Sequence, residues 1–269
     1  MRLALEDISI GNYEARFGPE QRFRWEESRR RVRAEFAGVM VADSRKAMLL
    51  LESGRLPVYY FPMVDVRMDL LEPTPHRTHS ALKGDASYWM LRVGDRVAEK
   101  AAWGYSDPPR DGPPVRGYIS FYWDKMDAWY EEEERVFGHA RDPYHRVDIL
   151  RSSRHVRIEL GGVTIAETRR PRMLLETQLP VRYYIPEQDV RMDLLAPTNS
   201  VSYCPYKGKA SYWSATVDDK TYKDIVWSYR DVLPACTPIK GLLCFYDERV
   251  DATYVDGELV VKPNTPWSD

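Results

Sequence analysis

The chain of 269 residues carries 39 Lys and Arg against 41 Asp and Glu, a formal net charge of −2 at pH 7. This balance gives no electrostatic reason to expect a nucleic-acid partner, and no apolar run approaches the length of a membrane span. The amino terminus becomes charged before a signal-peptide core forms, so we expect a cytoplasmic protein. Aromatic residues are plentiful, with 18 Tyr and 8 Trp, and these side chains suit half-buried strands and ligand surfaces.

The sequence repeats itself at an interval of 124 residues. The heptapeptide Asp-Val-Arg-Met-Asp-Leu-Leu occupies residues 65–71 and again residues 189–195. Residues 32–136 align with residues 156–260 without a gap, and 42 of these 105 positions are identical. Self-similarity at a domain-sized interval predicts two copies of one fold. We therefore assign a lead-in segment at 1–30, a first repeat domain at 31–137, a second lead-in at 138–153, a second repeat domain at 154–261 and a tail at 262–269.

Each repeat begins with a predicted hairpin. Residues 32–42 alternate between apolar and polar side chains on either side of an Ala-Gly turn, and residues 156–166 repeat this pattern around Gly-Gly. The charged lead-in shares several residues with the second lead-in at the same interval. We therefore expect each lead-in to pack on its own domain.

The next segments are short. Residues 47–52 favour a single helical turn, and residues 59–61 a short strand that Pro62 stops. The repeated heptapeptide alternates with a period of two, which predicts a strand with two unlike faces. The predicted faces are Asp65, Arg67 and Asp69 on one side and Val66, Met68 and Leu70 on the other.

The second half of each repeat predicts further strands. A loop is expected after Pro73-Thr74, followed by strands over residues 86–93, 103–105 and 117–122. In the first of these strands, Trp89 points to one face, which has an apolar pattern, and Tyr88 points to the other. Short strands between turn signals, without a long helical period, predict an all-β fold for both copies.

Four motifs, present in order in both repeats, resemble the bacterial and fungal domain of unknown function numbered 427, a family also catalogued as nucleotidyltransferase-like. The motifs are Tyr-Tyr-x-Pro-x-x-Asp-Val, Lys-Gly-x-Ala-x-Tyr, Trp-x-Tyr and Gly-x-x-x-Phe. The resemblance implies two tandem domains of the β-tent (Mss4-like) architecture, in which two antiparallel sheets meet at an angle. Several relatives of that architecture bind zinc, and some, such as the thalidomide-binding domain of cereblon, hold small ligands in an aromatic cage.

The chemistry of those relatives does not transfer directly. The three cysteines, Cys204, Cys236 and Cys244, all fall in the second repeat without a paired spacing, so we expect no metal and no cofactor. The chain also has neither a Gly-Ser motif followed by paired carboxylates nor a Gly-rich phosphate loop. The family often carries Cys-Pro before the Lys-Gly motif; only the second repeat has it, which predicts that the second repeat is the more family-like.

Aromatic residues are the candidate ligand-binding groups. Trp103, Tyr105 and Asp107 would share one face of a strand, as would their counterparts in the second repeat. We predict an aromatic pocket in each copy. The predicted walls are Tyr88, Trp103 and Tyr105 in the first repeat and Tyr212, Trp227 and Tyr229 in the second. Alternatively, the tryptophans pack in the core and the tyrosines cover its rim.

Charged groups are the candidate catalytic residues. Lys83 and Lys207 each precede a glycine, and each could pair with an anionic group or act as a base. We predict Asp65 and Asp189 at the pocket mouths, where each could form an acid–base pair with its lysine. Cys204 could serve as a nucleophile if Lys207 favours its thiolate. Solvated lysines, surface aspartates and a plain thiol are the alternatives, and His76 and His79 are expected at the surface.

Three classes of function remain open. The first is binding of a small molecule, nucleotide-like or otherwise planar, in an aromatic pocket. The second is an enzyme of transferase or hydrolase type that uses the Lys/Asp pair. The third is a structural or protein-interaction module, for which the aromatic residues would form an open flat patch. The sequence leaves the oligomeric state undetermined.

Overall fold

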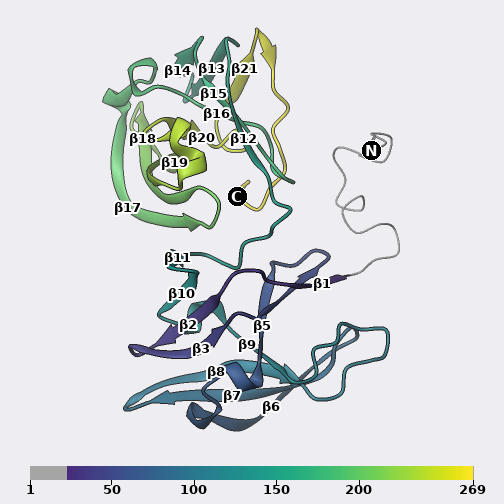
Figure 1. Ribbon diagram of the computed structural model, residues 1–269. Coiled ribbons are helices and arrows are strands. Elements are labelled where there is room, and N and C mark those ends of the chain that lie inside the picture. Colours follow the sequence, from purple (N-terminus) through teal and green to yellow (C-terminus); the bar gives the residue numbers. More distant parts are fainter. Residues whose placement is uncertain (1–22, 269) are drawn as a thin grey trace, which may run out of the picture. The chain divides into compact units, whose positions relative to one another are not determined.

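The computed structural model describes residues 23–268, and these form antiparallel β-sheets joined by turns and short 3-10 helices (Figure 1). The fold is all-β, as predicted. The chain divides into two compact domains, residues 1–142 and 143–269. Most of the first predicted lead-in, residues 1–22, lies outside the described residues. Within the described residues, no helix has the length and apolarity needed to cross a membrane.

The first domain contains a seven-stranded and a four-stranded sheet. The seven-stranded sheet consists, in spatial order, of β1 (Phe23–Glu27), β4 (Met48–Glu52), β5 (Val58–Pro62), β9 (Tyr118–Phe121), β8 (Arg96–Tyr105), β7 (Gly84–Val93) and β6 (Leu71–Ser80). The four-stranded sheet consists of β11 (Glu134–Val136), β10 (Ala128–Glu131), β2 (Val32–Phe36) and β3 (Val39–Ser44).

The second domain contains one three-stranded and two four-stranded sheets. They consist of β12 (Val147–Arg151), β15 (Arg172–Glu176) and β16 (Arg182–Tyr184); of β17 (Leu195–Cys204), β18 (Gly208–Val217), β19 (Lys220–Val232) and β20 (Leu243–Phe245); and of β14 (Val163–Thr168), β13 (Val156–Leu160), β21 (Ala252–Val255) and β22 (Glu258–Leu259). Ile185 and Leu243 bridge the first two of these sheets, as the paired residues Phe61 and Ile119 join β5 to β9 in the first domain.

The two domains are copies of one fold. Strands β1, β2, β3, β4, β6, β7 and β10 each have a counterpart whose bounds are shifted by 124 residues, the interval of the sequence repeat. The lead-in strands pair with their own domains, β1 with β4 and β12 with β15.

Alternation along the strands decides which faces are buried. In β2, Val32, Ala34 and Phe36 are buried while the charged residues between them are not. This face packs with one face of the seven-stranded sheet, which contributes Phe61 and Ile119, into the main core of the first domain. The other face of that sheet carries a second, aromatic cluster that includes Tyr60, Tyr88 and Tyr105.

The repeated heptapeptide is not a strand, so that prediction is wrong. It begins at the last residue of one 3-10 turn, Met63–Asp65, and contains a second, Met68–Leu70; between the two turns, Val66 bridges Ala42 of β3. The predicted division of side chains survives nonetheless: Val66 is buried, and Met68 and Leu70 pack on the core. Arg67 and Asp69 form an exposed ion pair. Residues Val66 and Arg67 between the two 3-10 turns are not helical, so alternate side chains can still point inward over this short segment.

Two further segments differ from the prediction. Residues 48–52 form strand β4 rather than a helical turn, and this strand pairs with the edge strand β1 on one side and with β5 on the other. The segment after Pro73-Thr74 is the edge strand β6 rather than a loop. An edge strand tolerates proline because one side of its backbone pairs with no neighbour, and the β6–β7 register shifts between Pro73 and Arg77.

The Lys-Gly motif owes its glycine to a close backbone approach. Gly208 has φ +116°, and a Cβ at this position would collide with the carbonyl oxygen of Asp231 on β19.

Gly208→Ala should therefore lower the free energy of unfolding for two reasons, backbone strain and this collision. The collision should add about 1–3 kcal/mol to the loss that strain alone causes. Gly162→Ala is the matched control: it has φ +78° and nothing within 4 Å of its Cβ position, so it carries only strain of about 1–2 kcal/mol. Equal losses in urea unfolding would contradict the close-approach explanation.

Candidate functional site

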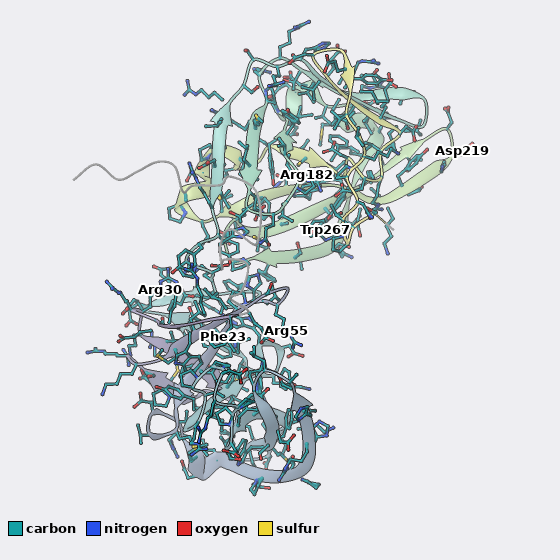
Figure 2. All side chains as sticks on the ribbon, turned by 90° about the vertical axis from the view of Figure 1, so that its right-hand side faces the viewer. Phe23, Arg30, Arg55, Arg182, Asp219 and Trp267 are labelled. Carbon is teal, nitrogen blue, oxygen red and sulfur yellow. The ribbon has the colours of Figure 1, made fainter. Side chains whose placement is uncertain are left out.

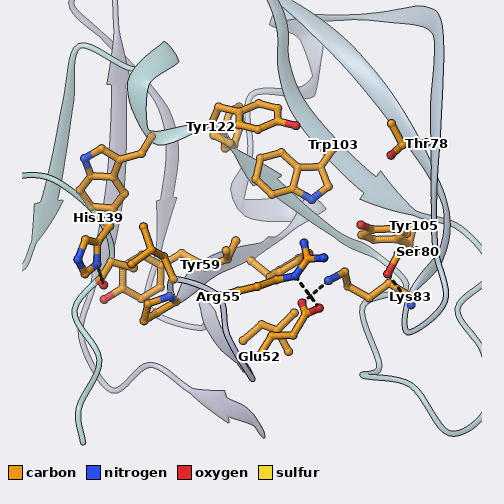
Figure 3. Close-up of a pocket in the computed structure, with 18 of the residues that line it drawn as sticks. Glu52, Arg55, Tyr59, Thr78, Ser80, Lys83, Trp103, Tyr105, Tyr122 and His139 are labelled. Atoms are coloured by element: carbon orange, nitrogen blue, oxygen red, sulfur yellow. Dashed lines mark hydrogen bonds and ion pairs between the residues drawn. The ribbon is translucent and has the colours of Figure 1, made fainter. Parts of the chain in front are cut away.

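The first domain contains a cavity of about 670 Å³ on the aromatic face of its seven-stranded sheet (Figure 3). Strands β4 to β10 supply its lining, together with the loops that follow β4, β6 and β9 and residues 138–140 after β11. The side chains fall into an aromatic part around Trp103 and Tyr122 and a charged part around Glu52, Arg55 and Lys83. All three aromatic residues predicted for the first pocket, Tyr88, Trp103 and Tyr105, line this cavity.

Trp103 provides the main aromatic surface of the cavity. Its ring lies 4.5 Å from that of Tyr122, centroid to centroid, at an interplanar angle of 43°. The Tyr60 ring packs edge-on against the Trp103 ring, with the two ring centroids 6.5 Å apart. Trp103 is only half-buried, whereas Tyr60 is fully buried. Trp123 and Trp129, which also line the cavity, stack on each other with centroids 4.5 Å apart. The indole of Trp103 thus presents apolar surface to the cavity on a rigid aromatic support.

The tyrosines contribute neutral hydroxyl groups. The Tyr88 hydroxyl lies 2.9 Å from that of Thr78, so either can donate to the other. Burial, together with the nearby Tyr88 and Glu52, raises the pKa of Tyr105 to about 12. Burial and the neighbouring Tyr88 likewise raise the pKa of Tyr122 to about 12. At neutral pH both groups keep their protons and can donate hydrogen bonds to a bound molecule.

The charged part is built around one carboxylate. Glu52, at the end of β4, accepts a hydrogen bond from the Nζ of Lys83 and pairs with the Nε of Arg55 at 3.1 Å (Figure 3). Lys83 is only 6% exposed, and Glu52 is also largely buried. Arg55, in contrast, has a side chain that is 69% exposed. Two cations therefore share one anion, and the group carries a formal charge of +1.

The predicted pairing of Lys83 with Asp65 is wrong. Asp65 does not line the cavity; its carboxylate accepts a 2.6 Å hydrogen bond from Ser44 at the end of β3. Asp189 in the second domain likewise accepts a 2.6 Å hydrogen bond from Thr168, and it also binds Arg170. The Arg170 guanidinium and the Thr168 hydroxyl lower the pKa of Asp189 below its ordinary value. Both aspartates thus hold a turn against β3 or β14, and within residues 23–268 neither has a lysine partner.

The lysine–glutamate pair recurs in the second domain. The Nζ of Lys207 donates a hydrogen bond to Glu176, which also lies 3.0 Å from the Nε2 of His145. Burial alone would raise the pKa of Glu176, but the hydrogen bonds from His145 and Lys207 outweigh it and hold the pKa below its ordinary value. Leu179 replaces Arg55 at the equivalent position. The second domain therefore has the pair without the exposed arginine.

Arg182 distinguishes the second domain most clearly. Trp227 and Tyr246 keep the arrangement of Trp103 and Tyr122, with centroids 4.4 Å apart at 46°. The guanidinium of Arg182 lies over the Trp227 ring, 5.5 Å from its centroid, and is held by Glu248 and Asp247. Figure 2 shows Arg182 inside the second domain, where it is 6% exposed.

The first domain has different residues at these positions. Val58 stands where the second domain has Arg182, and Trp123 and Asp124 stand where it has Asp247 and Glu248. The two tryptophans differ in exposure in the same sense: Trp227, which Arg182 covers, is buried at 8% exposure, whereas Trp103, which has no such cover from Val58, is half-buried. The predicted residues Tyr212, Trp227 and Tyr229 belong to the same aromatic cluster, but Arg182 covers the Trp227 ring.

Cys204, the candidate nucleophile, is partly buried. It lies at the end of β17 and packs against an apolar cluster that includes Ala210, Tyr229 and Cys236. All three cysteines are free thiols. Within residues 23–268, no three His, Cys, Asp or Glu side chains come together in a way that could hold a metal ion.

The arrangement found in both domains agrees with a comparison of the sequence with known families. The family described as a domain of unknown function (DUF427), named as nucleotidyltransferase-like, matches residues 24–132 and again residues 148–256. The chain belongs to this family. The two DUF427 matches lie 124 residues apart and together cover most of the chain. A comparison with curated proteins gave no match.

Several residues of the site were not singled out from the sequence, among them Glu52, Arg55, Tyr122 and Arg182. A signal existed for Glu52, because Leu-Leu-Glu ends the same segment in both copies, at residues 50–52 and 174–176. Arg55 and Arg182 carry no such signal, since each occurs in one copy only. Their importance lies in the difference between the copies.

The buried pair in the second domain predicts a large effect of removing one partner. Lys207→Met should lower the free energy of unfolding by about 3 kcal/mol at neutral pH, because Glu176 would lose its ammonium partner while staying buried. Adding Glu176→Leu should restore most of this loss, since no buried charge then remains. Urea unfolding of the full chain measures both changes. A double variant as unstable as the single one would contradict this explanation.

The same pair predicts a dependence on pH. Since the folded protein lowers the pKa of Glu176, its contribution to stability is complete above the ordinary carboxyl value of 4.5 and is lost as the pH falls through the lowered value. Glu176→Gln should therefore flatten the acid side of the stability profile, as followed by unfolding at a series of pH values. A profile that keeps the wild-type slope would show that other carboxylates dominate it.

Proposed function

We propose that the protein binds a small planar molecule in the cavity of the first domain, with the ring of the ligand against Trp103. The observation that carries the proposal is the partly buried indole of Trp103, which lines the cavity together with Tyr122. Ligand sites are typically concave and apolar, with a few polar groups at defined positions. This cavity combines aromatic walls with the Glu52, Arg55 and Lys83 group.

The concave shape bears on the alternative of a protein-interaction module. An interaction surface would present its aromatic residues on an open patch. Here Trp103 and Tyr122 lie within a cavity of about 670 Å³, a volume typical of sites for drug-sized molecules. The geometry therefore favours a small ligand over a protein partner.

The enzyme alternative has weaker support. Lys83 and Glu52 could in principle exchange a proton, but an equivalent pair occurs in the second domain, where Arg182 covers the indole. The lysine–glutamate pair is present both in the first domain, where the indole lines a cavity, and in the second, where Arg182 covers the indole. A role in the fold that both domains share explains the pair better than catalysis does. We therefore propose binding rather than catalysis.

The second domain supports the assignment of the site to the first. Arg182 places its guanidinium on Trp227 in the position that a ligand ring would take on Trp103. The counterpart of Arg182 in the first domain, Val58, lines the cavity and is too short to cover the indole. We therefore expect one ligand per chain, although the Cys-Pro dipeptide favoured the second copy as the more family-like.

Truncation of the cavity indole tests this proposal. The full chain is screened with benzene, naphthalene, indole and purine compounds by ligand-observed NMR, and affinities are measured by calorimetry. Trp103→Ala should weaken binding by about 1–3 kcal/mol because the stacking surface is lost. The matched control is Trp227→Ala, which should leave affinity unchanged because Arg182 already covers that ring. Binding by none of the ring classes, or equal binding by folded Trp103→Ala, would refute the proposal.

An exchange of residues between the copies tests it from the other direction. Val58→Arg introduces the second domain's residue, whose long side chain extends into the cavity beside Trp103 and should obstruct the site. The expected result is loss of ligand binding, at least tenfold, with the unfolding transition retained. Val58→Leu is the control that adds bulk without a long cationic side chain. Unchanged affinity in Val58→Arg would show that the ligand does not use the surface next to Val58.

A further inference from the structure

The charge around the cavity is unbalanced in favour of cations. Among the described lining residues, Glu52 is the one acidic side chain, and it already pairs with both Lys83 and Arg55. The only other basic side chains in the lining are His79 and His139, which are neutral or cationic. A ligand group placed here meets a formal charge of at least +1.

The two cations retain hydrogen-bond donors for a further anion. An ammonium has three donors, and within residues 23–268 the Nζ of Lys83 donates to Glu52 alone. Arg55 uses its Nε toward Glu52, and its two terminal nitrogens have no acceptor in the same part of the chain. The terminal nitrogens of a guanidinium form a fork that suits carboxylate and phosphate oxygens.

Arg55 occurs only in the first domain, the copy with the described cavity. The counterpart of Arg55 in the second domain is Leu179, and the carboxylate there takes His145 as its second partner. The exposed cation is therefore absent from the domain in which the indole is covered. Lys83 by itself does not distinguish the two copies, because Lys207 makes the same pair. The charge that is specific to the open cavity belongs to Arg55.

The relative positions of the two parts complete the argument. In Figure 3, Trp103 lies between Tyr122 on one side and the Arg55, Lys83 and Glu52 group on the other. A ring on the indole can thus extend a charged substituent toward Arg55 and Lys83. Building on the proposed function, we infer that the ligand is a planar aromatic ring carrying one anionic group, a carboxylate or a phosphate.

A cationic ligand is the obvious rival, because Arg182 itself is a cation on an indole. Its charge, however, is neutralised by Glu248 and Asp247. At those positions the first domain has Asp124, which is exposed and does not line the cavity, and Trp123, which carries no charge. The first domain therefore lacks the carboxylates that make a cation stable on the indole of the second.

Ligands that share one ring and differ in charge test the inference. Indole-3-acetate, indole-3-acetamide and tryptamine are anionic, neutral and cationic at neutral pH; their affinities for the full chain are measured by calorimetry. The anion should bind at least about tenfold more tightly than the amide, since charge-assisted hydrogen bonds are the stronger kind. This preference should shrink between about 50 and about 500 mM salt, because mobile ions screen exposed charges. Adenosine 5′-monophosphate and adenosine form a second pair, which distinguishes a phosphate from a carboxylate as the preferred group.

The variants assign the preference to a residue. Arg55→Leu, which introduces the second domain's residue, should reduce the ratio of anion to amide affinity to near one while leaving amide binding unchanged. Arg116→Leu is the matched control, because it removes an exposed arginine of the same domain that does not line the cavity. Arg55→Lys should keep part of the ratio, since it keeps the charge without the planar fork.

The outcomes separate this inference from the proposed function. If the amide binds as tightly as the anion, if tryptamine binds best, or if Arg55→Leu keeps the full ratio, the inference is wrong while a planar-ligand site remains. If no compound of either ring series binds, both the inference and the proposed function are refuted.

Discussion

In each domain, an ammonium–carboxylate pair with little exposure joins two strands that are not neighbours in a sheet. Glu52 ends β4 and Lys83 immediately precedes β7, yet β5, β9 and β8 lie between these two strands in the sheet. Contact between their side chains requires the sheet to curl, so that one end of β4 approaches one end of β7. The cavity lies in the hollow that this curl creates. Glu176 and Lys207 make the equivalent contact across the second domain.

The pair also explains why so much aromatic surface lies on this face. Protein interiors are close-packed, so side chains of the sheet fill much of the space on its concave side. In the first domain Tyr60, Tyr88 and Tyr105 do this, while Trp103 remains half-exposed at the opening. In the second domain Arg182 completes the filling, and burial of its charge requires Glu248 and Asp247 beside it. The two copies thus share one framework and differ in a small set of residues that act together.

The sequence predicted the framework better than the site, for physical reasons. Alternation along 32–36 reports burial of one face, and the structure confirms it. The run 47–52 is mainly apolar, so its period is ambiguous, and the helical-turn interpretation concealed the strand that carries Glu52. Asp65 attracted attention because it is repeated, yet it binds Ser44 and holds a turn. A residue that is repeated in both copies is one that both domains require, and what both domains share is mainly the fold.

The groups most specific to the open cavity are therefore found in the difference between the copies rather than in their agreement. Lys83 is buried, and its partner Glu52 has a side chain that is only 14% exposed, so a change at either one alters the fold together with the site. Arg55 belongs to an exposed turn after β4, where exchange for leucine in the other copy left the buried pair intact. Such a position can change charge without disturbing the core. The duplication thereby separates two roles within one charged cluster, because one cation maintains the shape of the cavity and the other adjusts what the cavity accepts.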